Sequence, residues 1–186
     1  MPSNQPPLGA LPARFRRERL LIIGCGDVGV RVVRAQRHVR MLALTSNSAR
    51  VAELRALGVT PLLGDLDQPT TLKRLAGLAT RVLHLAPPPL RGSTDPRTHA
   101  LTRALSVRTP PRSWVYGSTS GVYGDCAGAW VGDSRLLNPA TPRAMRRVDA
   151  EARQRHYARL RGNAVRVSVL RIPGIYAPDR EGGTPR

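Results

Sequence analysis

Residues 19–29 read Arg-Leu-Leu-Ile-Ile-Gly-Cys-Gly-Asp-Val-Gly, and this stretch decides the fold. A short apolar run leads directly into three glycines with the spacing G-x-G-x-x-G, and a helical pattern begins at Asp27. Gly24 suits a tight turn, Gly26 lets the backbone approach a pyrophosphate, and Gly29 lets the next helix pack closely on the strand. The free N–H groups at the start of that helix favour a phosphate. The stretch therefore predicts a strand–turn–helix unit that binds a dinucleotide.

A structural interpretation of the same turn is the alternative, in which the glycines only allow a tight bend and hold no ligand. Cys25 is expected to be a small packing residue, and Asp27 can complement the positive end of the helix dipole. The ligand-binding interpretation is favoured, because further strands and helices alternate beyond this unit. On that interpretation the turn contacts the cofactor through Gly24, Cys25, Gly26, Asp27, Val28 and Gly29.

Apolar, β-branched runs alternate with helical patterns along most of the chain. Strands are predicted at residues 19–23, 41–45, 60–63, 81–85, 114–117 and 164–170. Helices are predicted at residues 27–39, 49–57, 70–78, 95–107 and 143–161. This alternation predicts an α/β fold, a Rossmann-type doubly wound parallel sheet with three α/β/α layers.

Length and composition limit the functional classes. The 186 residues suffice for one core, so we expect a disordered leader (1–18), a single NAD(P)-binding domain (19–180) and a disordered tail (181–186). No apolar run is long enough to cross a membrane, and the N-terminus lacks the apolar core of a signal peptide. A cytoplasmic protein without a membrane partner is therefore expected. The histidines and the two cysteines lack metal-ligand spacing, so no metal is predicted.

The formal net charge of +18 is the strongest compositional signal, and Lys73 is the only lysine among the 30 basic residues. A basic excess can indicate a nucleic-acid partner. Here the arginines are scattered and no nucleic-acid-binding motif accompanies them, so GC-rich codon usage is the favoured explanation. Nucleic acid stays a minor alternative. The arginines of the predicted helix at 143–161, among them Arg146, are expected to form a solvated face.

The end of the second predicted strand bears on the choice between NAD and NADP. A carboxylate there binds the ribose hydroxyls of NAD and repels the 2′-phosphate of NADP. The segment Leu44-Thr45-Ser46-Asn47-Ser48 contains no acid, and Arg50 follows it. The cofactor is therefore expected to be NADP or NAD, with NADP slightly favoured and Ser46 as a contact. Arg50 as an ordinary solvated helix residue is the alternative.

Several later segments resemble the extended short-chain dehydrogenase/reductases, the family of the NAD-dependent epimerase/dehydratases. Gly64-Asp65-Leu66 is similar to the family's acidic turn at the adenine, and Leu85-Ala86-Pro87-Pro88 to its small-residue stretch against the cofactor. Residues 116–124 resemble the active-site strand end, and residues 170–178 resemble the segment on the nicotinamide side. The resemblance covers about residues 20–180. The cofactor contacts that it implies are Asp65, Leu66, Ala86, Pro87 and Pro173.

The resemblance also implies a mode of catalysis. In the family a Ser or Thr hydroxyl and a Tyr activate the substrate oxygen, and a Lys lowers the pKa of that Tyr, which is about 10 in isolation. Thr119 matches the hydroxyl. Counted back from Glu151, the Tyr and Lys positions fall on Arg143 and Arg147. An arginine stays charged and cannot shuttle a proton, although Arg143 could stabilise an oxyanion and Arg147 could hold the ribose.

Three departures from the family pattern keep alternatives open. Ile23 stands where the extended group usually has its first glycine, which implies an atypical branch. Tyr116 or Tyr123 is a less favoured substitute for the missing Tyr. Family chains continue past the sixth strand into a region that shapes the substrate pocket, and here most of that region is expected to be missing. The resemblance implies an NAD(P)-dependent oxidoreductase or epimerase-like enzyme for an unidentified small molecule. A non-catalytic dinucleotide-binding protein is the alternative, and a homodimer is left open.

Overall fold

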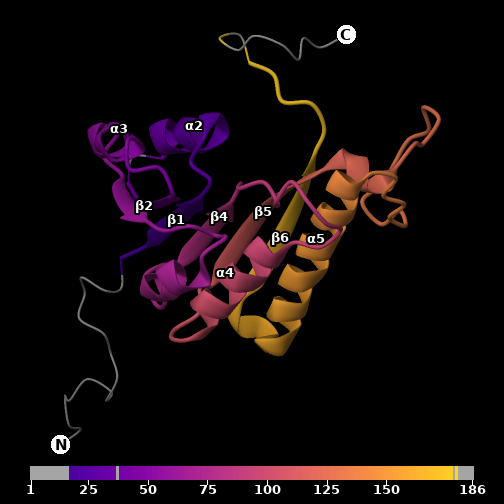
Figure 1. Ribbon diagram of the computed structural model, residues 1–186. Helices are drawn as coiled ribbons and strands as arrows, with labels where there is room; N and C mark the ends of the chain where they lie inside the picture. The colour runs from indigo at the N-terminus through magenta and orange to yellow at the C-terminus, as the bar shows by residue number, and fades with distance from the viewer. Residues whose placement is uncertain (1–16, 37, 178, 180–186) are drawn as a thin grey trace, which may run out of the picture.

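The computed structural model describes residues 17–36, 38–177 and 179, and its centre is a six-stranded parallel sheet. The strands are β1 (Arg19–Ile23), β2 (Arg40–Thr45), β3 (Thr60–Leu63), β4 (Arg81–His84), β5 (Ser113–Thr119) and β6 (Arg166–Ile172). Their spatial order is β3-β2-β1-β4-β5-β6, and all neighbouring pairs are parallel (Figure 1). The chain starts in the middle, runs outward to β3 and returns to β4. The topology therefore has a switch point at the carboxyl ends of β1 and β4, where ligands of such sheets bind.

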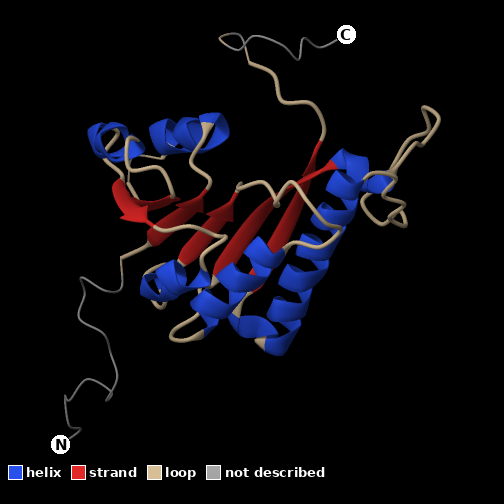
Figure 2. Ribbon diagram, in the orientation of Figure 1, coloured by secondary structure: helices blue, strands red, loops and turns tan. Residues whose placement is uncertain are grey.

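Helices cover both faces of the sheet. They are α2 (Asp27–Ala35), α3 (Arg50–Ala56), α4 (Pro96–Ser106) and α5 (Pro142–Leu160), with the short 3₁₀ helices η1 (Pro69–Leu75), η2 (Ser120–Tyr123) and η3 (Gly162–Ala164). Figure 2 shows α2 and α3 on one face and α4 and α5 on the other. The predicted three-layer, doubly wound architecture is confirmed. No helix in the described part of the chain has the length and apolarity needed to cross a membrane.

Two apolar cores form because successive side chains of a strand point to opposite faces of the sheet. Leu21 and Ile23 of β1 lie in the core beneath η1, α4 and α5, together with the fully buried Trp114 of β5. Ile22, between them in sequence, lies in the other core with Leu54 of α3. β1 is thus buried on both faces, which explains why its run Leu-Leu-Ile-Ile is uniformly apolar rather than alternating.

The α2–α3 face of the sheet is covered unevenly. In register, Leu83 of β4 pairs with Val115 of β5, and Gly117 of β5 pairs with Leu170 of β6. Leu83 and Val115 are only partly buried, and Leu170 is 50% exposed. Within the described residues, helices α2 and α3 therefore shield the half of the sheet around β1 and β2 much better than the half around β5 and β6 (Figure 1).

Most element bounds differ from the predictions by one or two residues, and three differences are described here. The first helix ends at Ala35 instead of residue 39, and the N–H of Gln36 bonds to the carbonyl of Val32 as a cap. The element predicted as a helix at 70–78 is the 3₁₀ helix η1, and it begins at a proline. The last strand begins at Arg166 instead of residue 164, because η3 occupies the preceding residues. The predicted leader and tail lie almost wholly outside the described residues.

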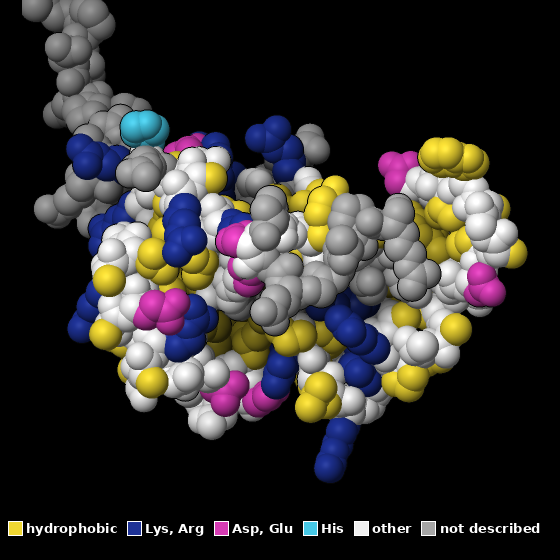
Figure 3. Space-filling view, turned by 90° about the horizontal axis from the view of Figure 1, so that it is seen from above, with side chains coloured by type: hydrophobic (Ala, Val, Ile, Leu, Met, Phe, Trp, Pro, Cys, Tyr) yellow, Lys and Arg dark blue, Asp and Glu magenta, His cyan; other side chains and the backbone are white. Residues whose placement is uncertain are grey.

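Basic side chains are spread over the face of the molecule that Figure 3 shows. Figure 3 shows Lys and Arg scattered across the face seen from above, with acidic side chains between them, rather than gathered into one patch. Arg146 is an exception to the predicted solvated face of α5. It is only 6% exposed, and its Nη1 donates to the carbonyl of Gly92 at 2.6 Å. That prediction was wrong for Arg146, because the loop before α4 packs over the start of α5.

Candidate functional site

The turn after β1 needs glycine for two separate reasons. Gly24 has a φ of +83°, and a Cβ built there would lie 2.5 Å from the backbone nitrogen of Ala86. The same close approach is visible in hydrogen bonds, since the N–H groups of Leu85 and Ala86 both donate to the carbonyl of Ile23 at 2.8 and 2.9 Å. Gly24 therefore joins the ends of β1 and β4 at the switch point.

The other two glycines of the motif have different surroundings. A Cβ on Gly29 would lie 3.2 Å from the Sγ of Cys25 and 3.4 Å from Ile22, so α2 packs tightly on β1, as predicted. Cys25 is 3% exposed and is part of that core, also as predicted. A Cβ on Gly26 would meet nothing within 4 Å, and Gly26 caps α2 without any side-chain hydrogen bond. The start of α2 thus presents backbone N–H groups at an open position, as a diphosphate requires.

A first cleft of about 390 Å³ lies on the β2 side of this turn. Its walls come from the turn and from the ends of the strands β2, β3 and β4. Arg50 and Arg97 complete it. The lining residues used below are Gly24, Cys25, Gly26, Ser46, Arg50, Asp65, Leu66, Leu85, Ala86, Pro87 and Arg97.

The two arginines of the first cleft are held by ion pairs. Arg50 donates to the carbonyl of Cys25 at 2.6 Å and pairs with both carboxylate oxygens of Glu53, and this hydrogen bonding lowers the pKa of Glu53. Arg97 pairs with both oxygens of Asp67 and donates to the carbonyl of Pro87 at 3.1 Å. Hydrogen bonds from Arg97 lower the pKa of Asp67. Both guanidinium groups are therefore fixed in place at the cleft rather than free in solvent.

A second cleft of about 320 Å³ lies on the other side of the turn, towards β5 and β6. It shares Gly24, Gly26 and Leu85 with the first cleft, so the two clefts are neighbours at the carboxyl ends of the strands. Its other lining residues are Asp27, Val28, Gly29, Gly117, Ser118, Thr119, Arg143, Arg147, Ile172, Pro173 and Ile175.

Each of the fifteen site residues predicted from the sequence lines one of these two clefts. Those in the first cleft alone are Cys25, Ser46, Asp65, Leu66, Ala86 and Pro87. Those in the second alone are Asp27, Val28, Gly29, Thr119, Arg143, Arg147 and Pro173. Gly24 and Gly26 line both. The structure thus brings the predicted residues together, and their roles stay predictions.

The described residues that line the second cleft include two cations and the hydroxyls of Ser118 and Thr119, but no phenol. Arg147 is 8% exposed, and its Nη1 donates to the hydroxyl of Tyr116 at 3.0 Å and to the carbonyl of Gly117 at 2.8 Å. Tyr116 itself is fully buried and does not line the cleft, and burial raises its pKa to about 12 despite Arg147. Tyr123 lies elsewhere, with its hydroxyl bonded to Arg171 at 2.8 Å. Neither tyrosine is among the described residues that line this cleft.

A buried histidine lies beneath this cleft. The ring of His84, at the end of β4, is 5.1 Å from the ring of Tyr116 and 6.2 Å from that of Trp114, centroid to centroid. Neither ring nitrogen has a hydrogen-bond partner among the described residues. Burial, and secondarily the charge of Arg147, lowers the pKa of His84 to about 3. His84 is therefore a neutral core residue and does not serve as a base in the cleft.

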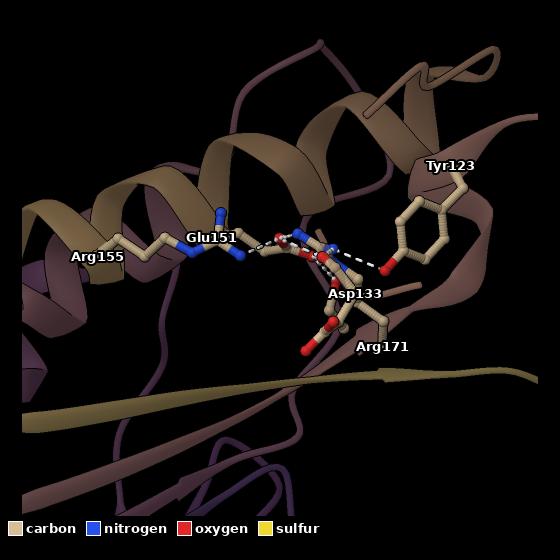
Figure 4. Close-up of polar contacts among 6 residues, drawn as sticks. Tyr123, Asp133, Glu151, Arg155 and Arg171 are labelled. Carbon is tan, nitrogen blue, oxygen red and sulfur yellow. Dashed lines mark hydrogen bonds and ion pairs between the residues drawn. The ribbon is translucent and has the colours of Figure 1, made fainter. Parts of the chain in front are cut away.

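A buried carboxylate next to the cleft was missed in the sequence. Glu151 of α5 is 0% exposed and accepts a hydrogen bond from Ser118 at 2.6 Å. Arg155 and Arg171 also donate to it, at 3.1 and 2.9 Å (Figure 4). Arg171 further contacts the Tyr123 hydroxyl and the carbonyl of Asp133. These contacts tie the end of β5, helix α5, strand β6 and the loop after η2 together, directly beside Thr119.

The fold and these clefts define a class of protein: a Rossmann-type α/β domain with two clefts that adjoin at the switch point of its parallel sheet. No family model and no curated protein matches the sequence. Solved structures do match. UDP-glucose 4-epimerase from Thermotoga maritima, solved with UDP-glucose, superposes with a TM-score of 0.72 at 19% identity over 90% of this chain and 60% of that one.

Two further structures extend the comparison. A functionally unknown conserved protein from Silicibacter pomeroyi has a TM-score of 0.69 at 30% identity, over 88% of this chain and 56% of that one. A short-chain dehydrogenase/reductase superfamily protein from Agrobacterium tumefaciens, with bound NAD, has a TM-score of 0.65 at 19% identity, over 83% and 48%. The chain thus has the extended short-chain dehydrogenase/reductase fold, and the predicted resemblance is confirmed at that level. It spans less than two thirds of the length of each of these structures.

Proposed function

We propose that this chain binds a nicotinamide dinucleotide along the two clefts, with the diphosphate at the turn after β1. The observation that carries the proposal is that the two clefts meet at Gly24 and Gly26, which line both of them. A dinucleotide has two nucleoside ends joined by a diphosphate. The turn offers what that centre needs: an uncrowded Gly26 and the uncapped start of α2. The solved structure with bound NAD supports the same ligand class.

The residues divide between the ends of such a ligand. Asp65, Leu66, Ala86 and Pro87 would contact the adenosine end in the first cleft. Pro173 would contact the nicotinamide end in the second cleft, and Arg147 would donate to its ribose hydroxyls. When bound, the dinucleotide supplies or accepts a hydride; the chain's own residues bind and orient it.

NADP is the preferred dinucleotide in this proposal. The first cleft has no carboxylate at the end of β2, and instead offers the hydroxyl of Ser46 and the guanidinium of Arg50. A 2′-phosphate there would share Arg50 with Glu53, and this sharing limits the preference. A charge-assisted hydrogen bond contributes about 1.5–3 kcal/mol, so we expect the low end of this range, a preference of about tenfold.

A fluorescence titration with NADPH and NADH tests both statements. Saturable binding of either supports dinucleotide binding, and tighter binding of NADPH supports the NADP preference. Arg50→Gln should abolish the difference between the two cofactors, whereas Arg103→Gln, which removes an equal charge from an exposed position on α4, should not. Failure of both cofactors to bind at low salt would contradict the proposal.

A second candidate function is an oxidoreductase or epimerase-like activity of the extended short-chain type. The observation that favours it is the position of Thr119 in the second cleft with Arg147, where a hydroxyl could polarise a substrate oxygen. The absence of a phenol from the residues that line this cleft favours a non-catalytic binding protein instead. Turnover of NADPH with carbonyl or nucleotide-sugar substrates separates the two. If turnover is found, Thr119→Val should reduce it without loss of cofactor binding.

A further inference from the structure

The start of helix α5 carries an unusual charge arrangement. The helix begins at Pro142, and its first turn contains no acid. Arg143, Arg146 and Arg147 all lie within its first six residues. Cations near a helix N-terminus are disfavoured, because the free N–H groups there already form the positive end of the dipole. Local arrangements that work against stability in this way are expected at functional positions.

The three arginines differ in how their charge is used. Arg146 is bonded to the carbonyl of Gly92 and does not line the second cleft. Arg147 lines the cleft and is over nine-tenths buried, and its Nε has no hydrogen-bond partner among the described residues. Arg143 also lines the cleft and is exposed, and its guanidinium has no hydrogen-bond acceptor and no carboxylate partner among the described residues. Two guanidinium groups one helical turn apart therefore act on the same cleft.

Little in the cleft neutralises these charges. Among the described residues that line it, Asp27 is the only acidic one, and its Oδ1 lies 3.1 Å from the Nε of Arg31 in an ion pair. Thr119 adds a hydroxyl to the lining. Partial enclosure weakens solvent screening, so this positive potential is stronger than it would be on an open surface. An anion in the cleft would relieve the mutual repulsion of Arg143 and Arg147.

We propose that Arg143 is the receptor for an oxyanion, a carboxylate or a phosphate, on a second ligand that enters the second cleft beside the dinucleotide. Arg147 supplies additional positive charge from beneath. The inference rests on the proposed function for the presence of the dinucleotide. It names the ligand class for that site: a small molecule that carries an anionic oxygen group. A planar guanidinium with its donors unused suits such a group well.

The test uses the full chain saturated with NADPH and two probes, oxamate for a carboxylate and inorganic phosphate for a phosphate, titrated at constant ionic strength against chloride. Binding is followed by calorimetry and by the fluorescence of the bound NADPH. We expect one or both probes to bind saturably to the NADPH-saturated chain, and Arg143→Gln, likewise saturated with NADPH, to bind them at least tenfold more weakly. Arg143→Lys should restore part of the binding.

The matched control is Arg159→Gln, which removes an exposed arginine near the other end of the same helix. Equal effects of Arg143→Gln and Arg159→Gln would overturn the proposal, as would probes that behave like chloride. If NADPH does not bind at all, the proposed function fails separately, and calorimetry of the probes on the chain alone still tests Arg143. Phosphate binding that survives Arg143→Gln but is displaced by NADPH would assign the anion to the turn after β1 and refute the inference.

Discussion

Glu151→Ala removes the carboxylate that joins β5, α5 and β6, and the expected cost follows from its contacts. The side chain is 0% exposed and accepts hydrogen bonds from Ser118 and from the guanidinium groups of Arg155 and Arg171. Arg171 is only 11% exposed, and hydrogen bonding to Glu151 raises its pKa. Without Glu151, a largely buried cation loses its counter-ion, for which the usual cost is about 3–5 kcal/mol.

The lower end of this range applies. Arg171 keeps its bonds to the Tyr123 hydroxyl and the Asp133 carbonyl, and Arg155 is 45% exposed and can be resolvated. We therefore expect a loss of about 3 kcal/mol in the free energy of unfolding. With a urea dependence of about 1–3 kcal/mol per molar, the midpoint should fall by about 1–3 M.

Urea unfolding followed by circular dichroism measures this change, and the same carboxylate offers its own control. Arg155→Ala removes an exposed i,i+4 partner of Glu151 and should cost no more than about 0.5 kcal/mol. A Glu151→Ala variant that loses less than about 1 kcal/mol, or no more than Arg155→Ala, would show that the network is only a surface contact and that the burial argument is wrong.

Three further predictions concern His84, the glycine turn and Arg97. In the folded chain His84 stays neutral down to about pH 3, whereas in the unfolded chain it protonates near the ordinary histidine pKa of about 6.5. Between these two pH values only the unfolded state binds the proton. The free energy of unfolding should therefore fall by up to about 1.4 kcal/mol for each pH unit below about 6.5. His84→Leu should flatten that slope in urea titrations between about pH 6.5 and 5, and an unchanged slope would exclude His84 as its source. Gly24→Ala should lower the free energy of unfolding by about 1–3 kcal/mol and abolish NADPH binding, since its Cβ would lie 2.5 Å from the nitrogen of Ala86. Gly26→Ala should leave the urea midpoint unchanged and weaken only NADPH binding. Equal urea midpoints for the two variants would contradict this explanation. Arg97→Ala should weaken NADPH and NADH equally in fluorescence titrations, because Arg97 is held by Asp67 and the carbonyl of Pro87, whereas Arg50 is held by Glu53 and the carbonyl of Cys25. A selective effect on NADPH would contradict this assignment.

The fold was predictable because its signals are local. The apolar run of β1, the glycines after it and the alternation of strands with helices each depend on nearby residues, and together they leave few topologies open. The predicted ends of helices were wrong where a cap or a 3₁₀ turn ended an element early, as at Ala35 and in η1. Such endings depend on single hydrogen bonds, which hydrophobic periodicity does not register.

The sequence predicted which residues line the site, but it did not predict which charged side chains are buried beside it. Strand ends of a parallel sheet meet at one edge, so residues after β1 to β6 had to gather there. The burial of Glu151 and Arg146 was not predictable, because both stand in a helix rich in arginine whose pattern gives no sign of which polar residue turns inward. Their partners, Ser118, Arg171 and Gly92, lie 20 to 54 positions away in sequence.

The residues that both clefts share, Gly24 and Leu85, limit how the two clefts can be changed by mutagenesis. Because Gly24 and Leu85 line both clefts, a substitution at either residue should affect both ends of a ligand that occupies the two clefts. Ser46 and Thr119 each border a single compartment. Under the proposed function, the choice of dinucleotide at Ser46 and the handling of a substrate at Thr119 should therefore be separately adjustable by mutagenesis, provided that Gly24 and Leu85 are left unchanged.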